Sequence, residues 1–186
     1  MAEVGDEPQS SVARLSAPGP LTIEHDLSGF DCGEPALNDW LRHRALKNES
    51  RFSRTYVTCD NNHVVAYFCI SAGAVDRGAA PGKLRRNAPD TIPVSVLGRL
   101  AVDHRYAGKG LGADMLSDAL RRIALASQSI GIGAVLVHAK DDAAKRFYLK
   151  HAEFIEYPVD SRTLFLSIEA LVAGSIGNEI TAANLM

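Results

Sequence analysis

Eight residues, RYAGKGLG at positions 105–112, limit the folds open to this chain more than any other segment. They lie between an apolar, β-branched run and a long helical pattern, and they hold three glycines. A strand that enters a helix through glycines leaves the first helical N–H groups unpaired, beside the positive end of the helix dipole. Glycine also lets phosphates approach the backbone, and Arg105 and Lys109 add positive charge. The segment therefore predicts a pyrophosphate-binding loop.

Two common phosphate-binding loops do not fit this spacing. The P-loop requires Gly-Lys followed by Ser or Thr, whereas Lys109 is followed by Gly110. The dinucleotide-binding loop requires G-x-G-x-x-G after the first strand, whereas Gly108, Gly110 and Gly112 are spaced G-x-G-x-G. The loop therefore serves a different ligand.

The first half of the chain predicts one helix and several strands. Residues 21–26 are a short strand candidate, and residues 35–48 have the apolar spacing of an amphipathic helix. Residues 53–60 and 63–75 flank an Asp-Asn-Asn turn, which indicates a β-hairpin. A basic loop, 76–89, leads to a strand at 91–103, in which Gly98 predicts a bulge or a close backbone approach.

The second half alternates helices and strands. We expect a helix at 111–127, a strand at 134–139, a helix at 142–151 capped by Asp141, and closing strands within 153–158 and 162–168. The order β-α-β-β-β-α-β-α-β-β predicts one α/β domain with a mixed sheet. We place that domain at 20–169, after a disordered lead-in at 1–19 that is rich in Pro, Ser, Gly and acids, and before a tail at 170–186.

Composition narrows the class of protein. The net charge of −2 gives no overall basic character, so any nucleic-acid contact would need a local patch. Cys32, Cys59 and Cys69 form no CxxC pair and no zinc spacing, so we expect no metal and a reducing compartment. The start of the chain lacks the apolar core of a signal peptide, and no apolar run has the length of a membrane span. We therefore expect a soluble, cytoplasmic protein.

Residues 105–110 match the Q/R-x-x-G-x-G/A signature and, with the strand before and the helix after, resemble the GNAT superfamily of N-acetyltransferases. The resemblance implies an α+β fold with a mixed, mostly antiparallel sheet of six or seven strands flanked by helices. It also implies that the fourth and fifth strands splay apart to admit the pantetheine arm of acetyl-CoA. The acetyl-CoA-binding residues implied in this way are Leu100, Ala101, Val102, Arg105, Tyr106, Ala107, Gly108, Lys109, Gly110, Leu111 and Gly112.

A general acid is expected on the helix after the fifth strand. Acetyl transfer needs a neutral amine, a stabilised oxyanion and a proton for the leaving thiolate. The segment AAKRFYLKHAEF resembles the family's FY-x-x-x-GF pattern, with Ala152 in place of the glycine, and this resemblance makes Tyr148 the acid. The alternative is that Phe147 and Tyr148 are only core aromatics.

A general base is not identified by the sequence. Asp103, His104 and Glu24 qualify by residue type alone, and a water molecule could serve instead. His138 lies on the expected fifth strand, where a hydrogen-bonded core histidine is the expected role. We therefore assign no base.

Residues 21–168 further resemble the bacterial GNAT toxins of type II toxin–antitoxin modules, through FDCGEPALNDWL, GRLAVD, GKGLG, VHAKD and FY. The resemblance implies acetylation of the α-amino group of aminoacyl-tRNA, which inhibits translation. It implies a ribbon-helix-helix antitoxin as partner, operator DNA bound only through the antitoxin complex, and a homodimer as an option.

A tRNA acceptor requires basic side chains around the amine entrance. The candidates for RNA contact are Arg42, Lys83, Arg85, Arg86 and Arg99, each of which could instead be a solvated surface charge. Two other functions remain open from the sequence. One is acetylation of a small amine or a protein amine, and the other is a non-catalytic acyl-CoA-binding module.

Overall fold

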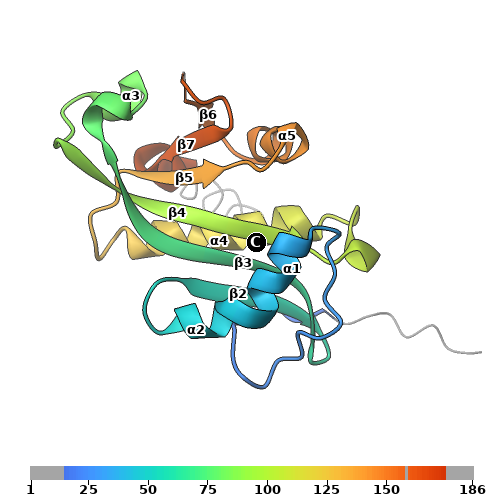
Figure 1. Cartoon of the computed structure of the whole chain (residues 1–186). Helices are drawn as coiled ribbons and strands as arrows, with labels where there is room; N and C mark the ends of the chain where they lie inside the picture. The colour runs from blue at the N-terminus through green and yellow to red at the C-terminus, as the bar shows by residue number, and fades with distance from the viewer. Residues whose placement is uncertain (1–14, 158, 175–186) are drawn as a thin grey trace, which may run out of the picture.

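A single mixed sheet organises the chain, as the computed structural model of residues 15–157 and 159–174 shows (Figure 1). Its strand order is β1-β2-β3-β4-β5-β7-β6, and every neighbouring pair is antiparallel except β4 and β5, which are parallel. The strands are β1 (Gly19–Pro20), β2 (Arg54–Asp60), β3 (His63–Asp76), β4 (Thr91–Val102), β5 (Ala134–His138), β6 (Ile155–Glu156) and β7 (Thr163–Ser167). This sheet confirms the expected fold class.

Helices cover both faces of the sheet. Figure 1 shows α1 and α2 in front of β2 to β4 and α4 behind them. The helices are α1 (Pro35–Trp40), which continues through a π-helical segment (Leu41–Ala45) into α2 (Leu46–Glu49), then α3 (Gly82–Arg85), α4 (Leu111–Ala126) and α5 (Asp142–His151). Short 3₁₀ turns lie at Arg77–Ala79 and His104–Tyr106, and residues 168–174 are also helical. Of the described helices, none is both long and apolar enough to cross a membrane.

Alternation along β3 explains why the sheet needs both layers. Successive strand side chains point to opposite faces. Tyr67 and Cys69 pack with Trp40 and Leu41 on the α1 side, whereas Phe68 packs with the helix α4 cluster on the other side. All of these side chains are buried. The central strand is therefore apolar on both faces, and burial of both faces stabilises the sandwich of helix, sheet and helix.

The predicted elements are largely present, with one error at the start. The hairpin is confirmed, and so are the expected helices at 111–127 and 142–151, which are α4 and α5. Asp141 caps α5 as expected, because it accepts from the Ala144 amide at 2.7 Å. Residues 21–26 are not a strand, because the Thr22 amide donates to His25 Nδ1 at 3.0 Å and closes a turn there. The first strand is instead Gly19–Pro20.

The ends of the expected domain are described only in part. Residues 15–20 of the expected lead-in and its border pair with β2: Leu15 forms a bridge to Asp60, and the Ser16 amide donates to the Cys59 carbonyl at 2.8 Å. Residues 1–14 and 175–186 lie outside the described residues. The domain borders at 19/20 and 169/170 therefore stay predictions.

Candidate active site

The two parallel strands part in the middle of the sheet. β4 pairs with β5 only from Val94 opposite Ala134 to Leu97 opposite Val137. The β3–β4 pairing shifts by one residue here, so Gly98 is the extra residue of a β-bulge, as the sequence predicts. A Cβ on Gly98 would come 3.2 Å from Cys69 Sγ, which explains the glycine. Beyond the bulge, β4 remains bound to β3 but leaves its β5 side open.

Residues 100–102 follow the bulge, on the part of β4 that β5 no longer covers. Leu100, Ala101 and Val102 pair with Phe68, Tyr67 and Ala66 of β3. Backbone groups of an antiparallel strand alternate between its two sides, so this stretch presents groups toward the open β5 side. Such groups could bind an extended arm with amide bonds, as a further strand would.

The glycine loop follows at the end of β4 and begins helix α4. Gly108 has φ +75° and Gly110, the residue before the helix, has φ +88°, and both values are in the left-handed region that favours glycine. Within the described chain, no backbone hydrogen bond is made by the amides of residues 108–112, whereas the next two amides bond to the Gly110 carbonyl. Five consecutive amides without backbone partners and the positive end of a 16-residue helix are therefore available to an anion.

Arg105 is held by a buried carboxylate. Its Nε and Nη2 donate to the two oxygens of Asp103 at 2.9 and 2.7 Å, and the same Nη2 donates to the Gly29 carbonyl. The Asp103 side chain is fully buried and also accepts from the amides of Arg105 and Asp31. Burial alone would raise the pKa of Asp103, but these hydrogen bonds outweigh it and lower that pKa to about 2. Arg105 thus fixes the loop in addition to adding charge.

Tyr106 and Lys109 complete the loop. The Tyr106 hydroxyl donates to Asp60 Oδ2 at 2.7 Å, which ties the loop to the β2–β3 turn. The Lys109 ammonium lies 5.9 Å from the centre of the Tyr106 ring and has no carboxylate partner among the described residues. Of the two cations in the loop, Lys109 is therefore the one free to meet an anion.

Tyr148 is buried in the core on α5, the helix that follows β5. It is 7% exposed and belongs to the same cluster as Leu97 of β4 and Val137 of β5. Its ring packs edge-on against Phe147 and Phe154, at centroid distances of 5.4 and 5.8 Å. Burial, with a smaller effect of Cys69, raises its pKa to about 12. The hydroxyl therefore keeps its proton at neutral pH and suits an acid rather than a base.

The α1 face of the splay carries a stacked cation. The Arg99 guanidinium lies 4.3 Å from the centre of the Trp40 ring, and Trp40 stacks on Tyr67 at 5.9 Å. The Tyr67 hydroxyl donates to the Leu37 carbonyl at 2.9 Å, which fixes the helix on the sheet. Arg99 is half-buried and makes no ion pair within the described residues, so it is a cation beside the point where the strands part.

The other basic candidates lie at different distances from the loop. Arg42 donates from Nη2 to the Phe30 carbonyl, on the α1 side. Lys83 and Arg85 of α3 and Arg86 directly after it are exposed, and α3 lies at the far end of the β3–β4 hairpin (Figure 1). The twelve residues of β4 separate them from the glycine loop by about 35 Å. The structure therefore brings Arg99 to the splay but leaves the α3 cluster remote from it.

None of the base candidates is poised as a catalytic base. Asp103 is bound to Arg105 and has its pKa lowered, so it is a weak base. Glu24 lies exposed in the turn after β1, and His104 Nδ1 lies 2.8 Å from the Asp31 carbonyl. His138 is exposed rather than in the core, because the last residue of β5 points to solvent, where its Nδ1 lies 3.0 Å from Thr163 Oγ1. Within the described chain no three His, Cys, Asp or Glu side chains group as a metal site would require.

Two contacts across the site, a hydrogen bond and an ion pair, are not predicted by the sequence. Asp103 joins the glycine loop to Asp31, 72 positions away, and Lys140 after β5 pairs with Glu34 before α1 at 3.2 Å. The only signal for the first link is the Asp103-x-Arg105 spacing, which permits a local bond but does not point to Asp31. Both links hold the segment before α1 against the two strands that part.

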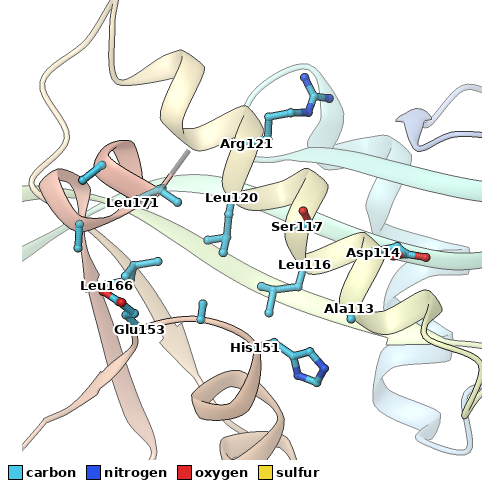
Figure 2. A pocket seen from close by; sticks show the side chains of 14 residues that line it. Ala113, Asp114, Leu116, Ser117, Leu120, Arg121, His151, Glu153, Leu166 and Leu171 are labelled. Carbon is cyan, nitrogen blue, oxygen red and sulfur yellow. The ribbon is translucent and has the colours of Figure 1, made fainter. Parts of the chain in front are cut away.

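A cavity lies beside helix α4. It measures about 860 Å³ and lies between α4 and the helical residues 168–174, with Leu116, Leu120, Leu166 and Leu171 pointing into it (Figure 2). Its lining contains neither Tyr148 nor residues 98–112. Its lining begins at Ala113, directly after the glycine loop, and includes His151 at the end of α5.

The splayed strands, the glycine loop and the fold together define an N-acetyltransferase of the GNAT type. Residues 22–154 match the family model described as "Acetyltransferase (GNAT) family", and the chain belongs to this family.

Its relatives include a toxin. The tRNA-acetylating toxin of Mycobacterium tuberculosis (strain ATCC 25618 / H37Rv) is 45% identical over 152 residues, which cover 81% of this chain and 91% of the relative. The structure of AtaT complexed with acetyl-methionyl-tRNAfMet matches with a TM-score of 0.78 and 30% identity, over 85% of this chain and 97% of that one. A Tyr-to-Phe mutant of AtaT, bound to the C-terminus of the antitoxin AtaR and acetyl-CoA, matches with a TM-score of 0.72 and 29% identity, over 85% and 96%.

Proposed function

We propose that this chain is the toxin of a type II toxin–antitoxin module and acetylates the α-amino group of aminoacyl-tRNA, which inhibits translation. The observation that carries the proposal is that β4 leaves β5 just before the glycine loop, where the amides of residues 108–112 have no backbone partners. The acceptor is supported by a relative of 45% identity that is a tRNA-acetylating toxin. An enzyme that consumes aminoacyl-tRNA would work in the cytoplasm.

The residues present fit acetyl-CoA, which would supply an acetyl group activated as a thioester. The amides of Gly108 to Gly112 would hold the pyrophosphate together with Lys109, because they have no backbone partners. Glycine is needed at Gly108 and Gly110, because a Cβ would strain their left-handed backbone. Tyr106 and Arg105 would fix the loop through Asp60 and Asp103. The open side of Leu100 to Val102 would bind the pantetheine amides. Ala107 and Leu111 complete the segment.

Tyr148 would be the general acid. Its hydroxyl is kept neutral by the raised pKa and lies on α5, the helix that follows β5. It would hold the proton that the departing sulfur needs. The attacking amine would lose its proton to water, because no described carboxylate or histidine is both free and near the splay. A similar structure, that of AtaT, was solved with a tyrosine replaced by phenylalanine, which is consistent with a functional tyrosine in such toxins.

Arg99 and Arg42 would contact the acceptor end of the tRNA from the α1 side, and Lys83, Arg85 and Arg86 would contact phosphates farther along it. A ribbon-helix-helix antitoxin would neutralise the enzyme, its C-terminal segment would wrap the toxin, and the complex would bind operator DNA. A homodimer would be compatible with this arrangement.

Induced expression in a bacterial host tests the proposal. We expect growth arrest by the wild-type chain, normal growth with Tyr148→Phe at the same protein level, and rescue by the small gene beside it. Tyr157→Phe, which changes a tyrosine outside the site, is the matched control and should still arrest growth. Harmless wild-type protein at a verified level in several hosts would contradict the toxin role. Acetylation of a small amine or a protein with none on tRNA would point to the second acceptor class.

A further inference from the structure

A second groove lies far from the glycine loop. It has a volume of about 480 Å³ and lies between the C-terminal half of α4 and the start of β2, the end of β3 and the start of β4. Its apolar lining includes Phe52, Ile70, Pro93, Ile130 and Ile132. Phe52 and Ile130 are 68% and 60% exposed, which is unusual for side chains of this size and marks the groove as a candidate binding surface.

One wall of the groove is an unpaired strand edge. β2 begins at Arg54, which pairs with Ile70, whereas β3 continues to Asp76. In the described chain, residues 71–76 therefore have β4 on one side and no strand on the other. Every second residue of such a segment points its N–H and C=O outward, and the side chains here are small. An extended peptide could add to this edge in line with β2.

The charged residues that line the groove are all arginines. Arg51, Arg54 and Arg122 line it, and no acidic residue does. Arg122 is paired with Asp118 at 2.6 Å and stacks 3.9 Å from the Tyr56 ring. Arg51 has no carboxylate partner within the described residues, and Arg54 donates only to backbone carbonyls. Two cations therefore remain for an anionic partner.

A buried hydroxyl at the groove also lacks a partner. Ser53 lines the groove, is 9% exposed, and its Oγ makes no hydrogen bond in the described chain. A buried polar group without a partner carries a desolvation cost, which a ligand that reached this hydroxyl would relieve.

We propose that this groove binds an extended segment of a partner protein in which acidic and apolar residues alternate. The segment would add a strand beside residues 71–76, place its apolar side chains against Ile70 and Ile130, and direct its carboxylates to Arg51 and Arg54. RNA is less well matched, because the floor is aliphatic and the edge offers backbone groups that pair with another backbone. The site is independent of the acetyl acceptor, because it lies at the opposite end of β4 from the loop.

The test uses the full chain and a synthetic peptide of about eight residues that alternates glutamate with valine. We expect titration calorimetry to detect binding, and amide NMR shifts to fall on residues 51–54 and 71–76. The same peptide with N-methyl groups on alternate residues should not bind, because it keeps its side chains but cannot pair as a strand. Arg51→Glu should weaken binding roughly tenfold or more, whereas Arg86→Glu, an exposed arginine outside the groove, should leave it unchanged.

Several outcomes would overturn the proposal. Absence of binding, or equal binding of the N-methylated peptide, would remove the strand-addition site. Displacement of the peptide by an oligouridylate that shifts the same amides would assign the groove to RNA. Peptide-free self-association that protects residues 71–76 would assign it to a second copy of this chain. Acetyl transfer should be equal in Arg51→Glu and wild type, so a failure here is separable from a failure of the proposed activity.

Discussion

At the residue scale, Tyr148 combines burial with a retained proton. Its surroundings are aromatic and aliphatic, and they raise its pKa to about 12, so it stays neutral over the whole range in which an amine acceptor loses its proton. A neutral hydroxyl can give a proton to a leaving thiolate but cannot take one from the amine. This is the electrostatic basis for assigning it as an acid.

Tyr148→Phe should lower kcat by about 100- to 10,000-fold, because it removes the proton donor while it keeps the ring that packs against Phe147 and Phe154. The affinity for acetyl-CoA should remain close to that of the wild type. Steady-state kinetics and calorimetry measure the two quantities, and Tyr157→Phe is the control. An unchanged kcat would exclude Tyr148 as the acid.

Asp103 should stabilise the fold in a pH-dependent way. Its folded pKa of about 2 is below the unfolded value of 3.8, so its stabilisation is complete above the unfolded value and is lost as pH falls toward the folded one. Asp103→Asn should therefore lower the free energy of unfolding by about 2 kcal/mol at neutral pH. Urea titrations should show the gap to wild type shrinking between about pH 4 and pH 2. Asp142→Asn, an exposed control, should show little change, and a gap for Asp103→Asn that does not vary with pH would contradict the role.

At the element scale, the turn from β4 into α4 depends on backbone conformation rather than on side chains. Gly108 and Gly110 take positive φ angles, and the helix then begins with its first amides unpaired. The sequence predicts this element well, because glycine spacing and a strand-to-helix change are local signals. The Asp141 cap and the hairpin turn with Asn61 at φ +54° are local in the same way.

Gly110→Ala should weaken acetyl-CoA binding roughly tenfold and destabilise the fold by about 1 kcal/mol, because an L side chain resists φ +88°. Thermal unfolding with and without acetyl-CoA measures both effects. Gly131→Ala is the matched control, because a Cβ there meets nothing within 4 Å and its φ is not positive. Equal acetyl-CoA stabilisation of the Gly110 variant and the wild type would contradict the proposed cradle.

Contacts between distant elements could not be predicted. Nothing local indicates that Asp103 accepts from the Asp31 amide, or that Arg99 stacks on Trp40, because these pairs form only when α1 packs on the sheet. Residues 21–26 show the converse error. Their apolar content favours a strand, but a Thr22–His25 hydrogen bond within the segment makes a turn.

At the scale of the whole molecule, basic residues are spread over a surface much longer than the splay. The α3 cluster lies about 35 Å from the glycine loop, a distance that a tRNA can span and a small amine cannot. A tRNA acceptor therefore predicts a function for this cluster, whereas a small acceptor predicts none.

The double variant Arg85→Ala, Arg86→Ala should raise KM for charged tRNA and reduce the slope of log affinity against log salt by roughly 1 to 2. Arg77→Ala is the control, because that arginine lies in the same segment but is already paired with Asp90 at 2.7 Å. Filter binding over a range of salt concentrations gives the slopes. Identical slopes in all three proteins would exclude phosphate contact by the α3 cluster.

Acetylation of charged tRNA is the reaction that the proposed function requires. The full chain would be incubated with acetyl-CoA and a mixture of aminoacyl-tRNAs, and the 3′-terminal aminoacyl-adenosines would be released with ribonuclease and identified by mass spectrometry. We predict an acetyl group on the α-amine of one or a few aminoacyl-adenosines with wild type and almost none with Tyr148→Phe. Unmodified aminoacyl-adenosines throughout, from protein that binds acetyl-CoA, would contradict the account.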